Sequence, residues 1–317
     1  MGVNWIFLPN FAPVLKFNMR SLGLSRLFQA HFCMLIAEIT WGMMAPIGKD
    51  AMTHGISGMD MVVFRTVGGA VCFWLTSFLT GNHEHVVKRD KLLFIVAAIL
   101  AIVTNQCCYI IGLSLTSPIN ASIVTTSMPI FTLGIGLLFH TERLTWRKIL
   151  GLSLGVSGAL TLILNSAGGQ GLSSGNIYGD LLCLTAQVSF AFYLALCGRL
   201  ISRYTTITCM KWMFLFVALI TLPIGTPSLM ELPWTEIEPK HWAESGFVVF
   251  GGTFFAYILM MKGQKVLTPT QVSVYNYVQP IVSTMLSMFW GIAMLGWMQG
   301  IAIALVFAGV QLVARKK

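Results

Sequence analysis

One carboxylate, Glu38, lies at the centre of an apolar segment, CMLIAEITWGMM at residues 33–44. In a hydrocarbon core an ionised carboxylate costs several kcal/mol unless it is paired, hydrated or protonated, so such residues usually face a cavity or a partner. At helical spacing Trp41 shares a face with Glu38, which would put an aromatic wall beside the carboxylate. The chemistry expected of Glu38 is therefore to bind a proton or a cationic group in a cavity.

Two structural interpretations of Glu38 stay open beside the functional one. Arg65 lies in the next apolar run and is the obvious partner for a buried ion pair. Alternatively, a neutral Glu38 would form a hydrogen bond to a neighbouring helix. In the functional interpretation Glu38 and Arg65 act in coupling, and Glu38 takes up a proton or a cationic group while the site is open and hydrated.

The composition identifies lipid as the main solvent of this chain. Hydrophobic residues make up 56% of the sequence, charged residues only 10%, and the mean hydropathy is +0.78. These values exclude a water-soluble globule. Apolar runs of about 20 residues, enough to cross a hydrocarbon core of roughly 30 Å, recur along the chain. We predict an all-α integral membrane protein with ten transmembrane helices.

The predicted spans are Leu27–Lys49, Met59–Thr80, Leu92–Ser114, Pro118–His140, Ile149–Asn165, Ile177–Leu200, Thr206–Gly225, Ala243–Met261, Pro269–Trp290 and Ala293–Ala314. With the N-terminus in the cytoplasm, most of the 20 lysines and arginines fall in cytoplasmic segments, whereas only Lys49 and Lys240 fall outside. This bias is the positive-inside pattern, and it places both termini in the cytoplasm. The net charge of +9 thus reports orientation and requires no nucleic-acid partner.

The two halves of the sequence match each other. Near the start of each half, AEITWG aligns with AQVSFA, so that Glu38 corresponds to Gln187. Further along, one gapless register pairs Pro118 with Pro269, Ser122 with Ser273, Pro129 with Pro280, Trp146 with Trp297 and Gly158 with Gly309. Five helices are an odd number, so the second copy must enter the membrane from the opposite side. Inverted repeats are typical of carriers that open a central site to each side in turn.

This repeat predicts the organisation of the chain. We expect an N-terminal cytoplasmic or interfacial segment at 1–26, a first five-helix repeat at 27–165, a flexible linker at 166–176 and a second repeat at 177–317. The apolar N-terminal stretch is not a signal peptide by pattern, because it lacks a cationic leading region and contains two prolines within MGVNWIFLPNFAPVL.

Two segments of the sequence resemble a known family. The segment WGMMAPIGKDAMTHGISGMDMVVFRTVGGAV and, in the second half, GDLLCLTAQVSFAFYLALCGRL are similar to EamA domains of the drug/metabolite transporter superfamily. The likeness extends over roughly residues 38–313. It implies a multi-pass carrier of the cell inner membrane, often an exporter of amino acids or related compounds. One departure is that Glu142 after the fourth helix has Ala293 as its counterpart, so any role of this charge is not symmetric.

Two prolines predict where the helices expose polar backbone. Pro129 and Pro280 each lie about midway along a span and free the carbonyl four residues earlier, at Thr125 and Asn276. A neighbouring side chain or a polar substrate can bind such a carbonyl. Tyr275 and Gln279 would share one face of the ninth helix with Gln271, and this face either lines a cavity or packs on a helix. The predicted cavity residues are Glu38, Trp41, Gln106, Tyr109, Gln187, Tyr193, Gln271, Tyr275, Asn276 and Gln279, with Asn105 and Tyr257 as weaker candidates.

Two short patterns in the sequence could suggest an enzyme instead. The sequence GLSLG at 151–155 matches a nucleophile elbow by letters only, since it lies in a predicted membrane helix. His83 and His85 lack the spacing of a zinc-binding helix, and no phosphate-binding loop occurs. The sequence therefore predicts no enzyme, no cofactor, no metal site and no obligate protein partner. It predicts a secondary active transporter in the lipid bilayer that exports a small amphipathic metabolite, with protons as candidate coupling partner; a membrane-embedded enzyme and a passive channel are the alternatives.

Overall fold

The computed structural model describes residues 25–82, 84–139, 145–147, 149–151, 153–154, 157–158, 161, 176–291 and 296–314. Most of the predicted interfacial segment, of the predicted linker and of the fifth span lies outside the described residues. So do Glu142 and Ala293, the unmatched pair of the two repeats. The described part of the chain is helical and contains no strand.

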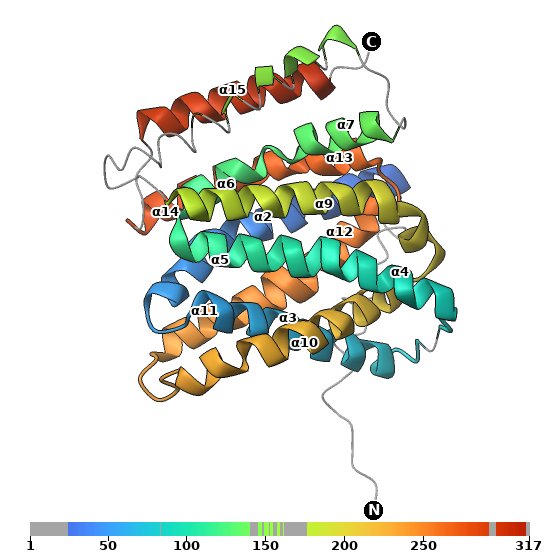
Figure 1. Cartoon of the computed structure of the whole chain (residues 1–317), viewed down its shortest axis with the longest axis vertical. Coiled ribbons are helices and arrows are strands. Elements are labelled where there is room, and N and C mark those ends of the chain that lie inside the picture. Colours follow the sequence, from blue (N-terminus) through green and yellow to red (C-terminus); the bar gives the residue numbers. More distant parts are fainter. Residues whose placement is uncertain are drawn as a thin grey trace, which may run out of the picture.

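The helices lie side by side in one bundle (Figure 1). In chain order they are α2 (Arg26–Thr53), α3 (Gly58–Leu79), α4 (Lys88–Ala98), η2 (Ile99–Cys107), α5 (Cys108–Leu115), α6 (Pro118–Thr125), α7 (Met128–Leu138), α9 (Ile177–Arg203), α10 (Thr206–Glu231), α11 (Pro239–Val249), η3 (Phe250–Phe255), α12 (Ala256–Gln264), α13 (Pro269–Val274), η4 (Tyr275–Tyr277), α14 (Val278–Phe289) and α15 (Trp297–Ala314). Seven helices among the described residues are long and apolar enough to cross a membrane, counting those with internal interruptions as one. They coincide with the first to fourth and the sixth to eighth predicted spans, and the count of ten stays a prediction.

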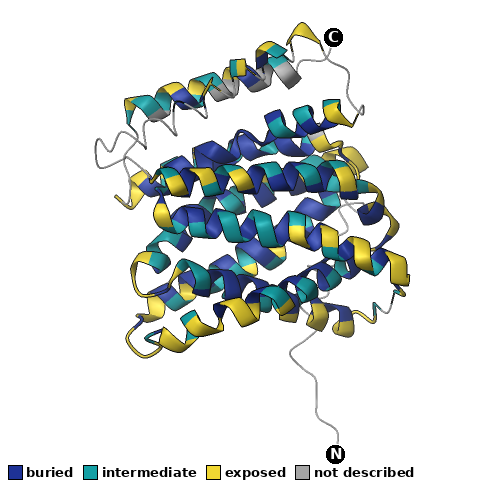
Figure 2. Ribbon diagram, viewed as in Figure 1, coloured by how far each residue is buried: buried dark blue, intermediate teal, exposed yellow. Residues whose placement is uncertain are grey.

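The outer surface of the bundle is apolar, as contact with lipid requires. Large hydrophobic side chains such as Phe78, Met285 and Phe289 are exposed, Phe289 to 84%. In Figure 2 the buried residues gather along the inner faces of the helices and the exposed ones on the outer faces and at the ends. A soluble monomer rarely exposes extended apolar patches. The chain is a multi-pass membrane protein.

Hydroxyl and amide side chains mark where the helices begin. Ser57 caps α3 in a capping box with Asp60, and Thr268 caps α13 in a second box with Gln271. Asn176 caps α9 by accepting from the backbone N–H of Tyr178. These caps satisfy backbone N–H groups that have no partner within the helix, at the ends of the predicted spans.

The two halves pack against each other in matching pairs. The first helix of the first half, α2, packs against α12 and α14 of the second half. The first helix of the second half, α9, packs against α5 and α7 of the first. The second helices of the two halves, α3 and α10, form the most extensive helix pair. Each half is therefore held mainly by the other, with the two first helices at the centre of the bundle (Figure 1).

Helices at matching positions of the two halves are interrupted. The third helix of the first half contains the π-helical segment η2, beginning at Ile99, and its counterpart contains the π-helical segment η3, beginning at Phe250. The fourth helix breaks between α6 and α7, just before Pro129. Its counterpart changes to the 3-10 turn η4 just before Pro280. Such breaks expose backbone carbonyls that must find donors inside the protein.

Two glycines allow the closest contact between α5 and α9. A Cβ added to Gly179 would lie 2.7 Å from the carbonyl oxygen of Gly112, and a Cβ added to Gly112 would lie 2.7 Å from that of Gly179. Both obstacles are backbone atoms, which cannot turn aside as a flexible side chain would. Small residues at such contacts are what allow membrane helices to approach closely.

We expect Gly179→Ala to destabilise the protein by about 1–3 kcal/mol, because it forces α5 and α9 apart. Gly198→Ala on the same helix is the matched control, since a Cβ there meets nothing within 4 Å. The measurement is the melting temperature of the purified chain in detergent. Equal melting temperatures for the two variants would contradict the close approach of Gly112 and Gly179.

Candidate functional site

A polar cavity lies in the middle of the bundle, between the two halves. It has about 490 Å³ of empty space, counting the open solvent at its mouth. Its walls come from nine segments of both halves, so neither half could form it alone. The lining residues are Trp41, Met44, Arg65, Asn105, Gln106, Tyr109, Thr125, Gln187, Phe190, Tyr257, Asn276 and Gln279.

The interrupted helices position the polar groups of this cavity. Asn105 and Gln106 belong to η2, and Asn276 to η4. The segment η3 presents the backbone oxygen of Gly252, which accepts from Trp41 Nε1 at 2.7 Å. The breaks in helical geometry thus lie where polar side chains and carbonyls are needed, as is frequent for π-helical segments at functional sites.

Arg65 is a buried cation in the cavity wall. Its residue is only 2% exposed, its Nε donates to Thr253 Oγ1 at 2.8 Å, and its Nη2 donates to the Gly252 oxygen at 3.3 Å. Both partners are neutral, and no carboxylate lies within ion-pair distance of Arg65 among the described residues. A guanidinium carries five N–H donors, so these two bonds leave donors available to an anion in the cavity.

Glu38 has a different partner from the one that the sequence suggested. Gln279 Nε2 donates to Glu38 Oε2 at 2.5 Å, and Glu38 is only 1% exposed. The expected ion pair with Arg65 is absent from the described contacts, because Arg65 turns toward the Gly252 carbonyl exposed by η3. The contact matches the alternative in which Glu38 forms a hydrogen bond to a neighbouring helix. Gln279 lines the cavity and Glu38 does not. Glu38 is connected to the cavity wall by its hydrogen bond to the Gln279 amide.

An aromatic wall faces the charged and amide groups. Trp41 and Tyr257 meet edge to face, with their ring centroids 5.5 Å apart. Gln106 donates from Nε2 to the Tyr257 hydroxyl, and its Oε1 is buried without a partner in the described part of the chain. A buried acceptor without a donor costs free energy that a ligand N–H would recover. The cavity therefore combines an aromatic surface with two groups that keep unused hydrogen-bonding capacity, the Arg65 guanidinium as donor and Gln106 Oε1 as acceptor.

The two kinked helices meet at their breaks. Asn276 Nδ2 donates to the oxygen of Thr125 at 3.4 Å, which is one of the two carbonyls that the prolines free. Next to it, the Tyr277 hydroxyl donates to the oxygen of Thr126 at 3.3 Å. Pro129 thus creates an acceptor in the membrane interior, and side chains from the opposite half supply donors at this break.

The structure brings together some of the predicted site residues and not others. At the cavity wall are Trp41, Gln106, Tyr109, Gln187, Asn276 and Gln279, and also Asn105 and Tyr257. Tyr193 lies outside the wall, since its hydroxyl donates to Gln264 Oε1 at 3.2 Å. Gln271 caps α13, and the Tyr275 hydroxyl bonds to His31 Nδ1 at 2.7 Å. The predicted common face of the ninth helix is lost because η4 changes the helical register between Gln271 and Gln279.

Sequence reasoning missed part of the wall. Met44 and Phe190 are apolar residues in apolar helices, and nothing in their surroundings distinguished them. Gly252 and Thr253, which bind Arg65, lie in the motif FGGTFF. The paired glycines in that motif were the available signal of a close backbone approach.

Comparison with known proteins identifies the family. The model of the EamA-like transporter family matches the chain twice, at residues 29–164 and 177–315. The chain belongs to the EamA-like transporter family. Its relatives include the uncharacterised transporter YyaM of Bacillus subtilis, which is 22% identical over 80% of this chain and 79% of its own length. The uncharacterised inner membrane transporter YedA of Escherichia coli is 27% identical over 62% of each chain.

A plant relative and a solved structure extend the likeness. The protein WALLS ARE THIN 1 of Arabidopsis thaliana is 29% identical over 46% of this chain and 40% of its own length. A crystal structure of another protein matches with a TM-score of 0.66 and 18% sequence identity. The match covers 92% of this chain and 97% of the chain in that structure. That structure shares the fold of this family member. The family's name and the names of YyaM and YedA indicate a membrane transporter.

We expect Glu38→Gln to fold normally and to keep its melting temperature in detergent, because a glutamine can still accept from Gln279 and no ion pair is lost. Gln279→Leu should destabilise the protein by about 1–3 kcal/mol, because it leaves the buried Glu38 without its donor. The exposed Met285→Leu on the same helix is the control. A Glu38→Gln variant that is unstable and is rescued by neutralising Arg65 would restore the ion-pair interpretation.

Proposed function

We propose that this transporter is a secondary active carrier of the cytoplasmic membrane that exports an amino acid or a related amphipathic metabolite by alternating access. The observation that carries the proposal is Arg65, a buried guanidinium in the cavity wall whose described partners are all neutral. A substrate that brings a carboxylate would supply the missing counter-charge.

The carboxylate end of the substrate is assigned to Arg65. A charged hydrogen bond contributes about 1.5–3 kcal/mol, and a planar guanidinium matches a carboxylate with two parallel bonds. The cost of burying the cation is already met in the folded protein, so a carboxylate that reaches it gains the interaction without first desolvating Arg65. Arg65 is thereby ready for an anionic group before the substrate enters.

The amine end and the apolar part are assigned to the opposite side of the cavity. Gln106 Oε1 is a buried acceptor for an ammonium N–H, and Glu38 lies next to the wall behind Gln279. The faces of Trp41 and Tyr257 suit an apolar side chain or an ammonium group. In this proposal Glu38 takes up a proton during the cycle, which couples export to a proton gradient.

Alternating access is proposed from the repeat. The matching packing of α2 on α12 and α14, and of α9 on α5 and α7, supports two equivalent five-helix units that exchange conformations. In this scheme the chain has ten spans, both termini in the cytoplasm, repeats at 27–165 and 177–317 and an outside linker at 166–176. YedA is named an inner membrane transporter, which supports the inner membrane as the location of this chain too.

The proposal predicts saturable transport of amino acids or related carboxylates in proteoliposomes. Arg65→Gln should lower the kcat/KM of this transport by about ten- to a hundredfold, because it removes the charged bonds to the carboxylate. Arg199→Gln, at an exposed position of α9, is the matched control and should be unchanged.

Competition separates the alternatives in the same assay. Amino-acid amides, which lack the carboxylate, should compete poorly with the substrate in the wild type. Equal competition by acids and amides would contradict the role of Arg65. Conversion of a compound without transport would indicate a membrane enzyme, and flux without saturation would indicate a passive channel.

The proposed orientation has a separate test. A reporter fused after Gly171 should be periplasmic, and reporters fused after Lys265 or at the C-terminus should be cytoplasmic, because the cation bias places them so. Paired alkaline phosphatase and fluorescent-protein fusions at each position measure this directly. The opposite result at either position would contradict the five-plus-five inversion.

A further inference from the structure

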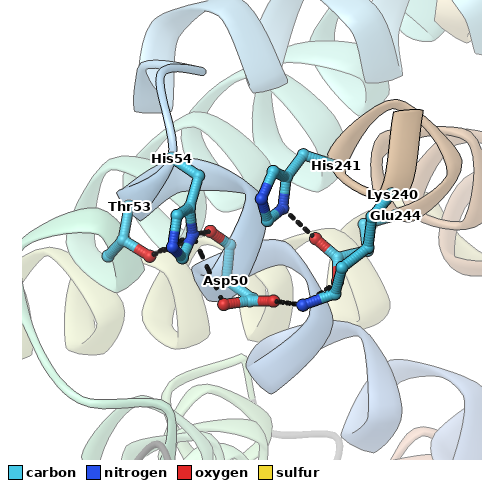
Figure 3. Close-up of polar contacts among 6 residues, drawn as sticks. All are labelled: Asp50, Thr53, His54, Lys240, His241 and Glu244. Atoms are coloured by element: carbon cyan, nitrogen blue, oxygen red, sulfur yellow. Dashed lines mark hydrogen bonds and ion pairs between the residues drawn. The ribbon is translucent and has the colours of Figure 1, made fainter. Parts of the chain in front are cut away.

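A second cluster of ionisable side chains, drawn in Figure 3, lies where the end of α2 meets the start of α11. Asp50 and His54 come from the end of α2 in the first half, whereas Lys240, His241 and Glu244 come from the start of α11 in the second half. The imidazole rings of His54 and His241 are stacked with centroids 4.3 Å apart. The cluster therefore joins the two halves through side chains that can bind metals.

Three of these residues offer ligand atoms close together. One carboxylate oxygen of Asp50 and one ring nitrogen each of His54 and His241 lie within 4.8 Å of one another. Two imidazoles and a carboxylate form a donor set that suits zinc and similar transition-metal dications, which use imidazole nitrogen far more readily than magnesium or calcium do. A water molecule would complete a four-coordinate site.

The surrounding contacts prepare both histidines as ligands. His241 Nδ1 lies 2.9 Å from Glu244 Oε2, and His54 Nδ1 lies 2.7 Å from the backbone oxygen of Asp50. A carbonyl or carboxylate oxygen only accepts, so the Nδ1 of each ring is the donor in these contacts and Nε2 is the nitrogen left for a metal. Metal-binding histidines in proteins are held in this way by a carboxylate or carbonyl on the second nitrogen.

Burial and access also suit a metal ion. His241 is buried, with 4% of its surface exposed, so its position is fixed by the bundle. The side chain of His54 is 53% exposed and can adjust to bring its nitrogen to the bonding distance of about 2.0–2.1 Å. An ion can therefore enter from solvent and find one fixed and one adjustable imidazole.

A cation already occupies the carboxylates. Lys240 Nζ lies 2.6 Å from Asp50 Oδ2 and 3.5 Å from Glu244 Oε1, and the Lys240 side chain is 60% exposed. A metal ion at Asp50 would take the place of this ammonium, which can move into solvent because of its exposure. Lys240 is thus a competitor for the site, and its removal should strengthen metal binding.

We propose that Asp50, His54 and His241 form a site for a zinc-class dication that links α2 to α11, with Glu244 orienting His241. The bound ion adds a bridge between the two halves at this end of the bundle and stabilises the arrangement in which α2 and α11 lie together. If the chain also works by alternating access as proposed above, the ion opposes the opening of this end and slows transport.

The test uses the full chain, purified in detergent with its purification tag removed, and zinc chloride as the probe. Zinc should raise the melting temperature of the wild type. The dissociation constant measured by calorimetry should be at least about tenfold higher in His54→Gln, since one ligand is lost. Lys240→Met should bind zinc more tightly than the wild type. His54 and Lys240 are exposed, so both variants should fold.

His85→Gln is the matched control, because His85 is an exposed histidine between α3 and α4, and its loss should leave zinc binding unchanged. Magnesium should have no effect in any variant. Absence of a zinc effect in the wild type, or an equal effect in His54→Gln and His85→Gln, would overturn the assignment. These outcomes are independent of transport, so failure of the proposed function would leave the zinc result interpretable.

Discussion

The hydrocarbon core supplies no hydrogen-bonding partner, and this constraint governs how the bundle is built. Every polar group that the sequence puts into a span must find a partner inside the protein. The interrupted helices expose carbonyls in the membrane interior, and side chains from elsewhere in the fold meet them. Asn276 donates to Thr125, and Trp41 and Arg65 both donate to Gly252. Polar side chains therefore gather where the breaks of the two halves face each other.

The same constraint explains why the cavity is formed by both halves. The π-helical segments η2 and η3 occupy matching positions, as do the breaks before Pro129 and Pro280. When two such units pack together, η2, η4 and the end of α6 contribute lining residues to one cavity, and η3 accepts hydrogen bonds from two side chains of its wall. Arg65 and Gln106 retain unused hydrogen-bonding capacity there, whereas the neighbouring breaks satisfy each other. A central cavity with unmet donors and acceptors is what a small polar molecule requires.

Helix α2 connects the cavity to the cluster at the end of the bundle. Trp41 lines the cavity and Asp50 lies nine residues later, about 14 Å away along the helix axis. On the other half, the continuous span from α11 through η3 to α12 carries His241 at one end and Tyr257 near the cavity. Any movement of α2 relative to this span changes both sites together. Under the two proposals, binding at one site is linked to the other through α2 and this span, without a longer chain of contacts.

The sequence by itself determined the solvent of the chain, the positions of seven of its long spans and the residues that lipid would reject, including Gln106, Gln187 and Asn276. Hydropathy, proline chemistry and span length are local properties, so they can be read without a fold. The tertiary structure decided which polar groups meet. It separated Glu38 from Arg65, turned Tyr275 toward His31, and joined Asp50 to a lysine far along the chain. The rotation of each helix about its axis, and the change of register at η2, η3 and η4, set these contacts, and both depend on packing between the halves.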